Sequence, residues 1–530
     1  MKKIILSLAA IALMCMVSCQ KDDRGYDIFK ASIEDNGKVL LGGDNSVQWQ
    51  AGDQIKVYNT AKASVFTASN ISTDGLTCDF NLSSGGKIYG DIISAYYPAT
   101  CFSHGDVVLP PMQEYDATNP IANVPMYAKT TDNTLHFKNL CSLLKLTLQK
   151  TDTVVKRISV TTDKGIWGTF HIDSSSSNYC IMADATSNNK TVMLTCGSGV
   201  DITNATDFYI YLPCGTYSTF EVKVYTSHDC CCTIAPTASS VTAARNTIHQ
   251  VSRNSMTFVA PAKFSVSNNT KVTFSEGNLQ YQPSSNTFVF AANQYDVIGS
   301  ANENVSSSYT GMLDLFGYAT SGYNGDATHR PTNYRPWSWE PTDANYLQAD
   351  MTGDQAHFDW GVHNAIGGYP AGEWRTLTAN EWRYLLFSRS GNRYAGVYVN
   401  NVQGILIYPD SYTWPSGIST PKKINEIPDK ANEWTSYTTD QWNTLKAAGF
   451  VFLPYAGYRE TTVKNNKPGD QGTTITISYT GSSFYYRTAT SASYVYINGK
   501  NLAVVGAAKP GETSHYEARG MAVRLVHTVQ

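Results

Sequence analysis

Three histidines and one aspartate are the side chains best suited to metal binding. His329, His357 and His363 form the only local group of histidines, and Asp359 lies between the last two. Imidazole nitrogens and carboxylates are ordinary zinc ligands, so a metal site is one hypothesis here. The chain has no His-Glu-x-x-His motif, and a solvated loop explains the stretch more simply. We therefore predict no metal and no other cofactor.

Signatures of common catalytic sites do not occur in the chain. It contains no Gly-x-Ser-x-Gly turn that would expose a serine nucleophile, and no Walker loop that would cradle phosphates. We therefore predict that the protein is not an enzyme and has no catalytic residues.

Consecutive cysteines, Cys230, Cys231 and Cys232, form the most unusual short pattern. Neighbouring cysteines have poor geometry for a bridge among themselves, and zinc would require a second pair of ligands. His228 is close, but no second pair follows. The chain has 11 cysteines, of which nine come after Cys19, so at least one of these nine stays unpaired within the monomer. We predict unpaired thiols, most of them buried in strands.

The amino terminus has the pattern of an export signal. Lys2 and Lys3 precede an uncharged apolar run, Ile4 to Val17. This run is shorter than the about 20 residues that span a bilayer, and it fits the core of a signal peptide. We assign residues 1–18 to the signal.

The end of that run resembles the processing box of bacterial lipoproteins. Met16-Val17-Ser18-Cys19 places small residues before a cysteine, although Met16 stands where leucine is usual. Lys21-Asp22-Asp23 resembles the surface-export tag of Bacteroidetes lipoproteins. The resemblance implies that Cys19 carries lipid, that residues 19–30 form a tether, and that the protein faces the exterior from the bacterial outer membrane. Acyl chains contribute about 0.8 kcal/mol per buried CH₂, which makes such an anchor stable.

The composition favours β-sheet and argues against nucleic acid as a partner. Charged residues make up 16% of the 530 residues, and 34 residues are tyrosine. Tyrosine and threonine are frequent in strands. A net charge of −3 provides no basic field for phosphate groups.

The chain divides into two halves near residue 255. Every cysteine lies at or before Cys232, whereas most tryptophans lie at or after Trp337. Residues 31–255 contain alternating apolar and polar segments, such as Gln54 to Tyr58, Leu144 to Leu148 and Phe220 to Tyr225, separated by Gly, Asn, Asp and Ser clusters. This period of two predicts half-buried antiparallel strands and a β-sandwich.

Motifs in the first half resemble those of fimbrillin-like proteins of Bacteroidetes. The opening motif is Trp49-Gln50-Ala51-Gly52-Asp53-Gln54-Ile55-Lys56-Val57. Further motifs follow in that family's order at Ala95 to Pro98, Leu109 to Gln113, Val124 to Ala128, Phe137 to Leu140 and Ile166 to Gly168. The resemblance implies tandem β-sandwich lobes of the kind used in pili. Trp49 itself is expected in the core, and Gly52-Asp53 in a turn.

The second half, residues 264–530, adds two short helices to its strands. Thr378 and Thr438 each begin a capping box, with Glu381 and Gln441 three residues later. Apolar residues follow on one face of each predicted helix, and Gly449 ends the second one. The apolar stretch Ala522 to Val526 predicts a closing strand.

The second half also resembles C-type-lectin-like and formylglycine-generating-enzyme-like domains. Trp374 to Trp382 matches their "W-R-x-L-T-x-x-E-W" signature, and Phe452 to Arg459 and Arg519 to Arg524 continue the match. The resemblance implies a compact α+β domain with long loops for ligands. The oxidase activity of that family requires active-site cysteines, and this half has none.

Calcium-dependent sugar binding has little support in the sequence. Glu340-Pro341-Thr342-Asp343 is faintly similar to a sugar-binding triplet of C-type lectins. Calcium takes six to eight oxygen ligands, and one glutamate and one aspartate are too few. We predict a polar loop here.

Aromatic loops in the second half are the better candidates for ligand contact, because aromatic rings stack on sugars and peptides. The alternative for each ring is a place in the core. The candidates are Tyr334, Arg335, Trp337, Trp339, Tyr485 and Tyr486.

These features together predict a surface lipoprotein that acts in adhesion. Its partners would be outer-membrane lipid through Cys19, pilus subunits, and a glycan or protein ligand. Two alternatives stay open: a structural pilus subunit without a ligand, and a glycan-capture lipoprotein of a nutrient-uptake system.

Overall fold

The computed structural model is rich in β-strand in the described residues of both halves. It describes residues 25–34, 47–59, 62–90, 92–103, 105–172, 179–187, 189–226, 230–234, 239–304, 306–323, 349–367, 369–462, 474–478, 480–491, 493–505 and 519–529. Strands account for 44% of the residues in the structure and helices for 10%. The mainly β character predicted from the alternating segments is confirmed.

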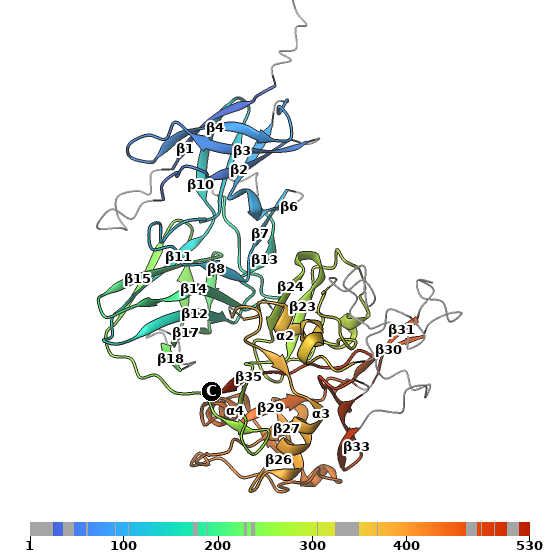
Figure 1. Cartoon of the computed structure of the whole chain (residues 1–530). Coiled ribbons are helices and arrows are strands. Elements are labelled where there is room, and N and C mark those ends of the chain that lie inside the picture. The colour runs from blue at the N-terminus through green and yellow to red at the C-terminus, as the bar shows by residue number, and fades with distance from the viewer. Residues whose placement is uncertain are drawn as a thin grey trace, which may run out of the picture.

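A closed barrel forms the first part of the chain, drawn in blue in Figure 1. Its strands follow one another in the order β1-β10-β9-β5-β2-β3-β4. They are β1 (Ile28–Ile33), β2 (Gln54–Tyr58), β3 (Ala63–Ser69), β4 (Thr77–Ser84), β5 (Ile93–Tyr97), β9 (Met126–Thr130) and β10 (Thr134–Asn139). β1 closes the ring because it pairs in parallel with β10 and antiparallel with β4. The strands of the first lobe therefore close into a barrel, whereas the sequence predicted a β-sandwich lobe.

Trp49 fills the centre of this barrel, as the sequence predicted. Its ring meets Phe80, Tyr97 and Phe137 edge-on at centroid distances of 5.0, 5.2 and 5.2 Å. The following turn is closed by Asp53, whose carboxylate accepts a hydrogen bond from the Gln50 amide at 2.8 Å. This turn delivers β2 to the barrel with alternate side chains buried.

A second lobe follows, with two larger sheets. The five-stranded sheet has the order β18-β17-β12-β14-β8 and the three-stranded sheet the order β15-β11-β20. Their strands are β8 (Met112–Glu114), β11 (Ser142–Leu148), β12 (Val154–Thr162), β14 (Thr191–Asp201), β15 (Thr206–Leu212), β17 (Phe220–Thr226), β18 (Cys231–Ile234) and β20 (Ile248–Arg253). Smaller sheets join β6 (Phe102–Ser103), β7 (Asp106–Leu109) and β13 (Gly168–Phe170), and pair β16 (Gly215–Tyr217) with β19 (Val241–Ala243). One apolar core runs through the barrel and this lobe.

The second half is a set of short sheets around three further apolar clusters. Its four-stranded sheets have the orders β21-β22-β35-β25 and β28-β26-β27-β29. The first comprises β21 (Phe264–Ser265), β22 (Lys271–Phe274), β25 (Arg375–Thr376) and β35 (Leu525–Val529), and the second β26 (Tyr394–Val399), β27 (Val402–Ile407), β28 (Thr435–Tyr437) and β29 (Val451–Pro454). Smaller sheets contain β23 (Leu279–Gln282) with β24 (Thr287–Phe290), β30 (Tyr458–Thr462) with β31 (Thr474–Ser478), and β32 (Phe484–Arg487), β33 (Tyr494–Asn498) and β34 (Asn501–Val505).

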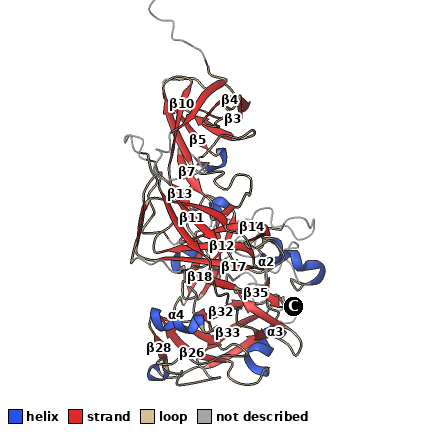
Figure 2. Ribbon diagram, turned by 90° about the vertical axis from the view of Figure 1, so that its left-hand side faces the viewer, coloured by secondary structure: helices blue, strands red, loops and turns tan. Residues whose placement is uncertain are grey.

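Helices are short, and in Figure 2 the longer ones lie at the end of the molecule opposite the barrel. Both capping boxes predicted from the sequence are present, ahead of α3 (Ala379–Arg383) and α4 (Thr439–Ala447). The other helical elements are α2 (Trp360–His363), the π-helical turn η5 (Tyr384–Ser388), and the 3₁₀ turns η1 (Ala99–Cys101), η2 (Pro283–Ser285), η3 (Gly299–Glu303), η4 (Gly353–Phe358) and η6 (Ala431–Glu433). Among the described helices, none is long and apolar enough to cross a membrane.

The two halves meet through a polar interface centred on Arg157 of β12. Its guanidinium lies between the rings of Tyr225 and Tyr369, at 3.9 and 3.3 Å from their centroids. Tyr225 donates a hydrogen bond to Glu276 of the second half. Burial alone would raise the pKa of Glu276, but Lys223 and other nearby cations lower it below its ordinary value. The second half is thus docked by these charged and aromatic groups, and Met312, Val289 and Ile298 of the second half also join the apolar core of the first half.

Candidate ligand-binding site

Most of the predicted ligand contacts lie outside the described residues. This is true of Tyr334, Arg335, Trp337 and Trp339, and the predicted lipidation site Cys19 also lies outside the described residues. Tyr485 and Tyr486, both on β32, are the two candidates that the structure describes. Because neighbouring residues of a strand point to opposite faces of the sheet, these two tyrosines have different surroundings.

Tyr486 belongs to the core. It has no exposed surface, and its hydroxyl lies 3.0 Å from the side-chain amide of Asn278 and 3.2 Å from the Pro454 carbonyl oxygen. Its ring packs against Phe484 and Trp382. The prediction that Tyr486 contacts ligand is therefore corrected: a ring enclosed by the core has no surface left for a ligand.

Tyr485 lies on the opposite face, within a group of four tyrosines. Tyr485 of β32 is directly opposite Tyr496 of β33, and Tyr494 shares that face two residues earlier. Tyr458, at the start of β30, completes the group. We call these four side chains the tyrosine face.

The rings of the tyrosine face are in mutual contact. Tyr485 stacks on Tyr494 and Tyr496 at centroid distances of 5.9 and 6.2 Å, with planes 30° and 24° apart. Tyr458 meets Tyr485 edge-on at 4.9 Å. Tyr485 and Tyr496 are partly exposed, whereas Tyr458 and Tyr494 are 8% and 5% exposed. The four rings thus form one contact group, in which Tyr485 and Tyr496 keep exposed surface.

Two arginines hold the edge of the tyrosine face. The guanidinium of Arg519 lies 4.8 Å from the centroid of the Tyr458 ring, a cation–π distance. Arg487, which is 2% exposed, donates from Nε to the Phe316 carbonyl at 3.1 Å and from Nη2 to the Arg519 carbonyl. Arg487 therefore fixes the backbone that presents Arg519 to Tyr458.

This arrangement suits stacking rather than acid–base chemistry. Aromatic rings provide large contact area at low entropy cost, and their faces pack on sugar rings and planar peptide groups. Tyrosine hydroxyls add hydrogen bonds at the rim. The tyrosine face is thus a candidate platform for a neutral, flat ligand.

Sequence reasoning identified only part of this platform. Tyr494 was visible in the same late segment as Tyr485, and the alternation Tyr494-Val495-Tyr496-Ile497 also carries the signal for Tyr496. Tyr458 and Arg519 are distant in sequence and reach the site only through the fold. No local pattern could have joined them to Tyr485.

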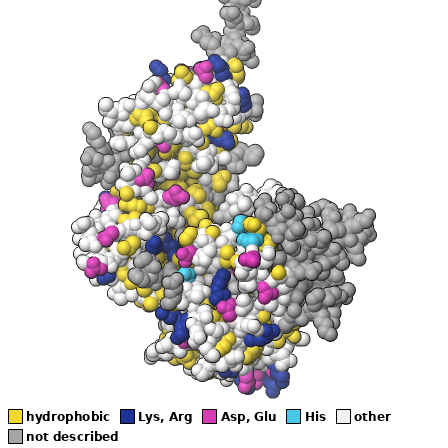
Figure 3. All heavy atoms as spheres, viewed as in Figure 1, with side chains coloured by type: hydrophobic (Ala, Val, Ile, Leu, Met, Phe, Trp, Pro, Cys, Tyr) yellow, Lys and Arg dark blue, Asp and Glu magenta, His cyan; other side chains and the backbone are white. Residues whose placement is uncertain are grey.

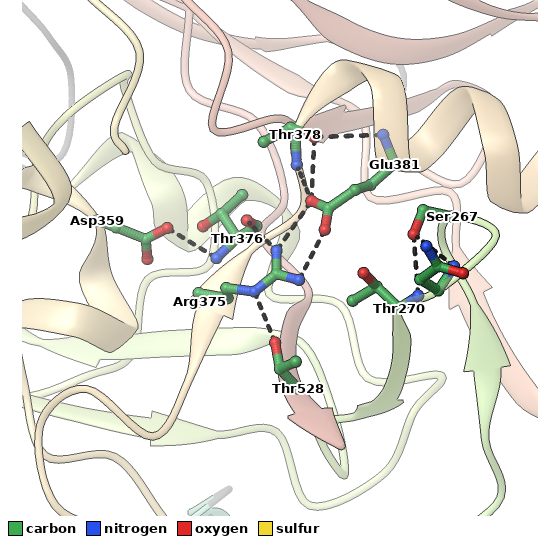
Figure 4. Close-up of polar contacts among 9 residues, drawn as sticks. Ser267, Thr270, Asp359, Arg375, Thr376, Thr378, Glu381 and Thr528 are labelled. Carbon is green, nitrogen blue, oxygen red and sulfur yellow. Dashed lines mark hydrogen bonds and ion pairs between the residues drawn. The ribbon is translucent and has the colours of Figure 1, made fainter. Parts of the chain in front are cut away.

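The tryptophan signature around Trp374 serves structure. Arg375 forms two parallel bonds to the Glu381 carboxylate at 2.7 and 2.8 Å, and its Nε donates to the Thr528 hydroxyl at 2.9 Å (Figure 4). Glu381 also accepts from the Thr378 amide at 2.8 Å, which completes the capping box of α3. The motif therefore fastens α3 and β25 to the closing strand β35.

Asp359 is a structural acid. It has 1% of its surface exposed, caps α2 by accepting from the Gly361 amide at 3.0 Å, and accepts from the Thr376 amide at 2.7 Å. Burial raises its pKa to about 6, against the lowering effect of these hydrogen bonds. Both oxygens are thus engaged by the backbone.

His357 and His363 lie beside Tyr323, with ring centroids 3.8 and 5.4 Å from the tyrosine ring. Burial and the neighbouring His357 lower the pKa of His363. His329 lies outside the described residues. Within the described ranges, no three His, Cys, Asp or Glu side chains gather in a way that could hold a metal ion.

The nine cysteines after Cys19 form no disulfide with one another in the described chain. Six are buried, and Cys180, Cys230 and Cys231 are partly exposed. Burial raises the pKa of the Cys101 and Cys196 thiols to about 12, so these stay protonated and unreactive at neutral pH. The prediction that most of these thiols are buried is confirmed, but of the six buried cysteines only Cys78, Cys196 and Cys232 lie in strands.

The sequence matches no protein-family model and no curated protein. Several solved structures are similar at low identity. A candidate cell adhesion protein from Bacteroides ovatus is 14% identical, with 44% of this chain and 96% of that chain covered and a TM-score of 0.29. The truncated tip fimbrial protein Mfa3 from Porphyromonas gingivalis is 10% identical, with 44% and 97% covered and a TM-score of 0.24. A fimbrial protein from Bacteroides ovatus is 10% identical, with 95% and 100% covered and a TM-score of 0.22.

Proposed function

We propose that this protein is a lipid-anchored adhesion protein on the outer surface of a bacterial cell, and that it binds its ligand without catalysis. The anchoring part rests on the box that ends at Cys19 and on the acidic tag that follows it. The fimbrillin-like first half would join or cap a pilus-like assembly. The lectin-like second half would present the binding surface.

The observation that carries the binding role is the tyrosine face. Two partly exposed rings, Tyr485 and Tyr496, lie on a sheet whose other face is locked into the core by Phe484 and Tyr486. A rigid aromatic platform loses little entropy when it binds, so it can hold a glycan or an extended peptide. Tyr334, Arg335, Trp337 and Trp339 remain predicted contacts of the same half.

Anchoring is tested on intact cells that produce the wild-type protein or the Cys19→Ser variant. We expect externally added protease to remove the wild-type protein from the cells, because a lipid-anchored protein with the acidic tag faces outward. The variant should lose its acyl chains and leave the membrane fraction. Cys15→Ser is the matched control, since it changes a cysteine of the signal that would not carry lipid. A wild-type protein that is fully protected from protease, or a Cys19→Ser protein that stays in the membrane, contradicts the proposal.

The binding role is tested by adhesion of the same cells to surfaces coated with glycans or matrix proteins. Cells with the wild-type protein should adhere more than cells without it, and Tyr485→Ala combined with Tyr496→Ala should remove the difference. Phe387→Ala is the control, because Phe387 is an exposed aromatic residue, 40% accessible, outside the tyrosine face. Equal adhesion by all strains would favour a structural subunit without a ligand.

A further inference from the structure

A cavity of about 580 Å³ lies where the barrel, the second lobe and the second half meet. On the face of the molecule drawn in Figure 3, hydrophobic side chains gather at the waist between the barrel and the second lobe. The cavity has the volume of a small-molecule site, which typically measures roughly 300–1,000 Å³. It is separate from the tyrosine face, because none of the four tyrosines lines it.

Three parts of the chain build the walls of this cavity. Leu143 and Tyr211 come from β11 and β15, where they are directly opposite each other, and Pro110 and Pro111 come from the turn before β8. Gln113 fixes that turn, because its side chain donates to the Tyr211 carbonyl at 2.9 Å and accepts from the Tyr211 amide at 3.1 Å. Thr287 contributes from β24 of the second half. The walls are thus set by strands and by prolines, and they are formed before any ligand enters.

Tyr211 places an unpartnered hydroxyl in the cavity. The residue is 6% exposed, and within the described part of the chain its hydroxyl has no hydrogen-bond partner, although its backbone has several. Burial raises the pKa of this hydroxyl above its ordinary value, so it remains a donor at neutral pH. The hydroxyl oxygen is not sealed from solvent, so a ligand acceptor would replace water as its hydrogen-bond partner.

The charges around the cavity restrict the class of ligand. Its described lining contains no lysine, arginine or histidine, so nothing there would neutralise a phosphate or a carboxylate. Glu114 is the one carboxylic acid in that lining, and its side chain is exposed. Prolines, aliphatic side chains and the rings of Trp167 and Tyr209 make up much of the remainder.

We propose that this cavity binds a small uncharged molecule with an apolar body and one acceptor group that takes a hydrogen bond from Tyr211. The ligand would be a neutral ketone, amide, ester or alcohol. Because both halves contribute to its walls, an occupied cavity would also brace the barrel, the second lobe and β24 against one another. This site is independent of the proposed adhesion.

The test uses the intact chain and a neutral fluorescent naphthyl ketone, 6-propionyl-2-dimethylaminonaphthalene, whose carbonyl is the acceptor. Its emission shifts to the blue in an apolar site, so a titration gives an affinity and a stoichiometry. The variants are Tyr211→Phe, which removes only the hydroxyl, and Ala122→Trp, which fills the space. Tyr408→Phe is the control, because it removes another buried hydroxyl without a partner, remote from the cavity in the second half. Thr287→Trp is a second filling variant from the other wall, in case Ala122→Trp does not fold.

We expect the wild type to bind the probe at one saturable site. Tyr211→Phe should weaken the affinity about fivefold to tenfold, and a filling variant that folds should not bind the probe. Tyr408→Phe, and Tyr485→Ala on the tyrosine face, should bind like the wild type. The anionic dye 1-anilinonaphthalene-8-sulfonate should not compete. No saturable binding, or binding unchanged in a folded filling variant, overturns the proposal, and loss of binding only in Tyr485→Ala would transfer the site to the tyrosine face.

Discussion

Buried arginines replace regular sheet pairing in the second half. Arg459, Arg487 and Arg524 are each 2% exposed or less. Each donates to backbone carbonyls of segments that are distant in sequence, and Arg524 reaches Ser275 and Phe452. In a domain of short strands, these guanidinium groups give backbone carbonyls a donor from a segment that is distant in sequence.

Arg524→Met should therefore destabilise the protein, although the methionine side chain is similar in length to that of arginine. It leaves the Ser275 and Phe452 carbonyls without this donor, and we expect the free energy of unfolding to fall by about 2–4 kcal/mol. Arg383→Met is the control, since Arg383 bonds only to Asn380 of its own helix at the surface, and it should cost less than about 0.5 kcal/mol. Denaturant titration measures both, and equal costs would show that burial of Arg524 is not what matters.

Asp359 should make the second half less stable as pH rises. Its pKa is about 6 in the folded chain and ordinarily 3.8, so the folded state holds the proton across this window while the unfolded state has lost it. The stability that Asp359 contributes is fully present below pH 3.8 and is lost as the pH rises through about 6. The loss is about 3 kcal/mol as an order of magnitude.

The comparison with Asp359→Asn isolates this contribution, because asparagine does not titrate. The wild-type free energy of unfolding minus that of the variant should fall between pH 4 and pH 7. A constant or rising difference over that range would contradict the assignment. Urea titrations at each pH provide the values.

At the scale of elements, local sequence patterns predicted the strands and helices whose formation depends on neighbouring residues. The alternation in β2, β11 and β17 and the capping boxes of α3 and α4 were all readable from neighbouring residues. The closure of the barrel by β1 could not be predicted from neighbouring residues, because the parallel pairing of β1 with β10 joins residues more than 100 positions apart. The one-turn helix α2 is too short for a periodic signal.

The same limit applied to the interface between the two halves. Arg157 shows the reason: a register shift between Val155 and Arg157 turns this side chain out of the core and toward the second half. A sequence pattern places both residues on one face of β12, since they are two apart. The bulge reverses that placement, and only the fold reveals it.

We predict that replacing Glu381 lowers the stability of the protein more than replacing Thr378, the N-cap residue of α3. Thr378→Ala removes the bond from the Glu381 amide to the Thr378 hydroxyl and the bond from that hydroxyl to the Glu381 carboxylate, and it should cost about 1 kcal/mol. Glu381→Ala also breaks both bonds to Arg375, which tie α3 to β25, and we expect about 2–3 kcal/mol from a charge-assisted pair that is partly shielded from water. Thermal unfolding of the two variants gives the ranking, and a larger loss for Thr378→Ala would contradict it.

At the scale of the whole molecule, the interface around Arg157 couples the halves. We expect the wild type to unfold in a single calorimetric transition at neutral pH. Arg157→Ala removes the stacking on Tyr225 and Tyr369, and it should separate the unfolding of the two halves into two transitions. Lys156→Ala, an exposed neighbour on the same strand, is the control.

Acid should weaken this interface as well. The pKa of Glu276 is lowered in the folded chain, so the stability that it contributes is present above its ordinary value of 4.5 and is lost as pH falls through its lower folded value. The two transitions should therefore separate in the wild type at acid pH. A single transition in Arg157→Ala at every pH would show that the halves are joined by other contacts.

The central claim is that the second half binds a ligand through the tyrosine face. The most direct measurement is an array of glycans and matrix proteins probed with the purified intact chain, in the wild type and in Tyr485→Ala, Tyr496→Ala, Trp337→Ala and Trp339→Ala. We predict a saturable signal that at least one of the tyrosine variants reduces tenfold or more. A blank array from folded protein, or a signal that neither tyrosine variant changes, would contradict the claim.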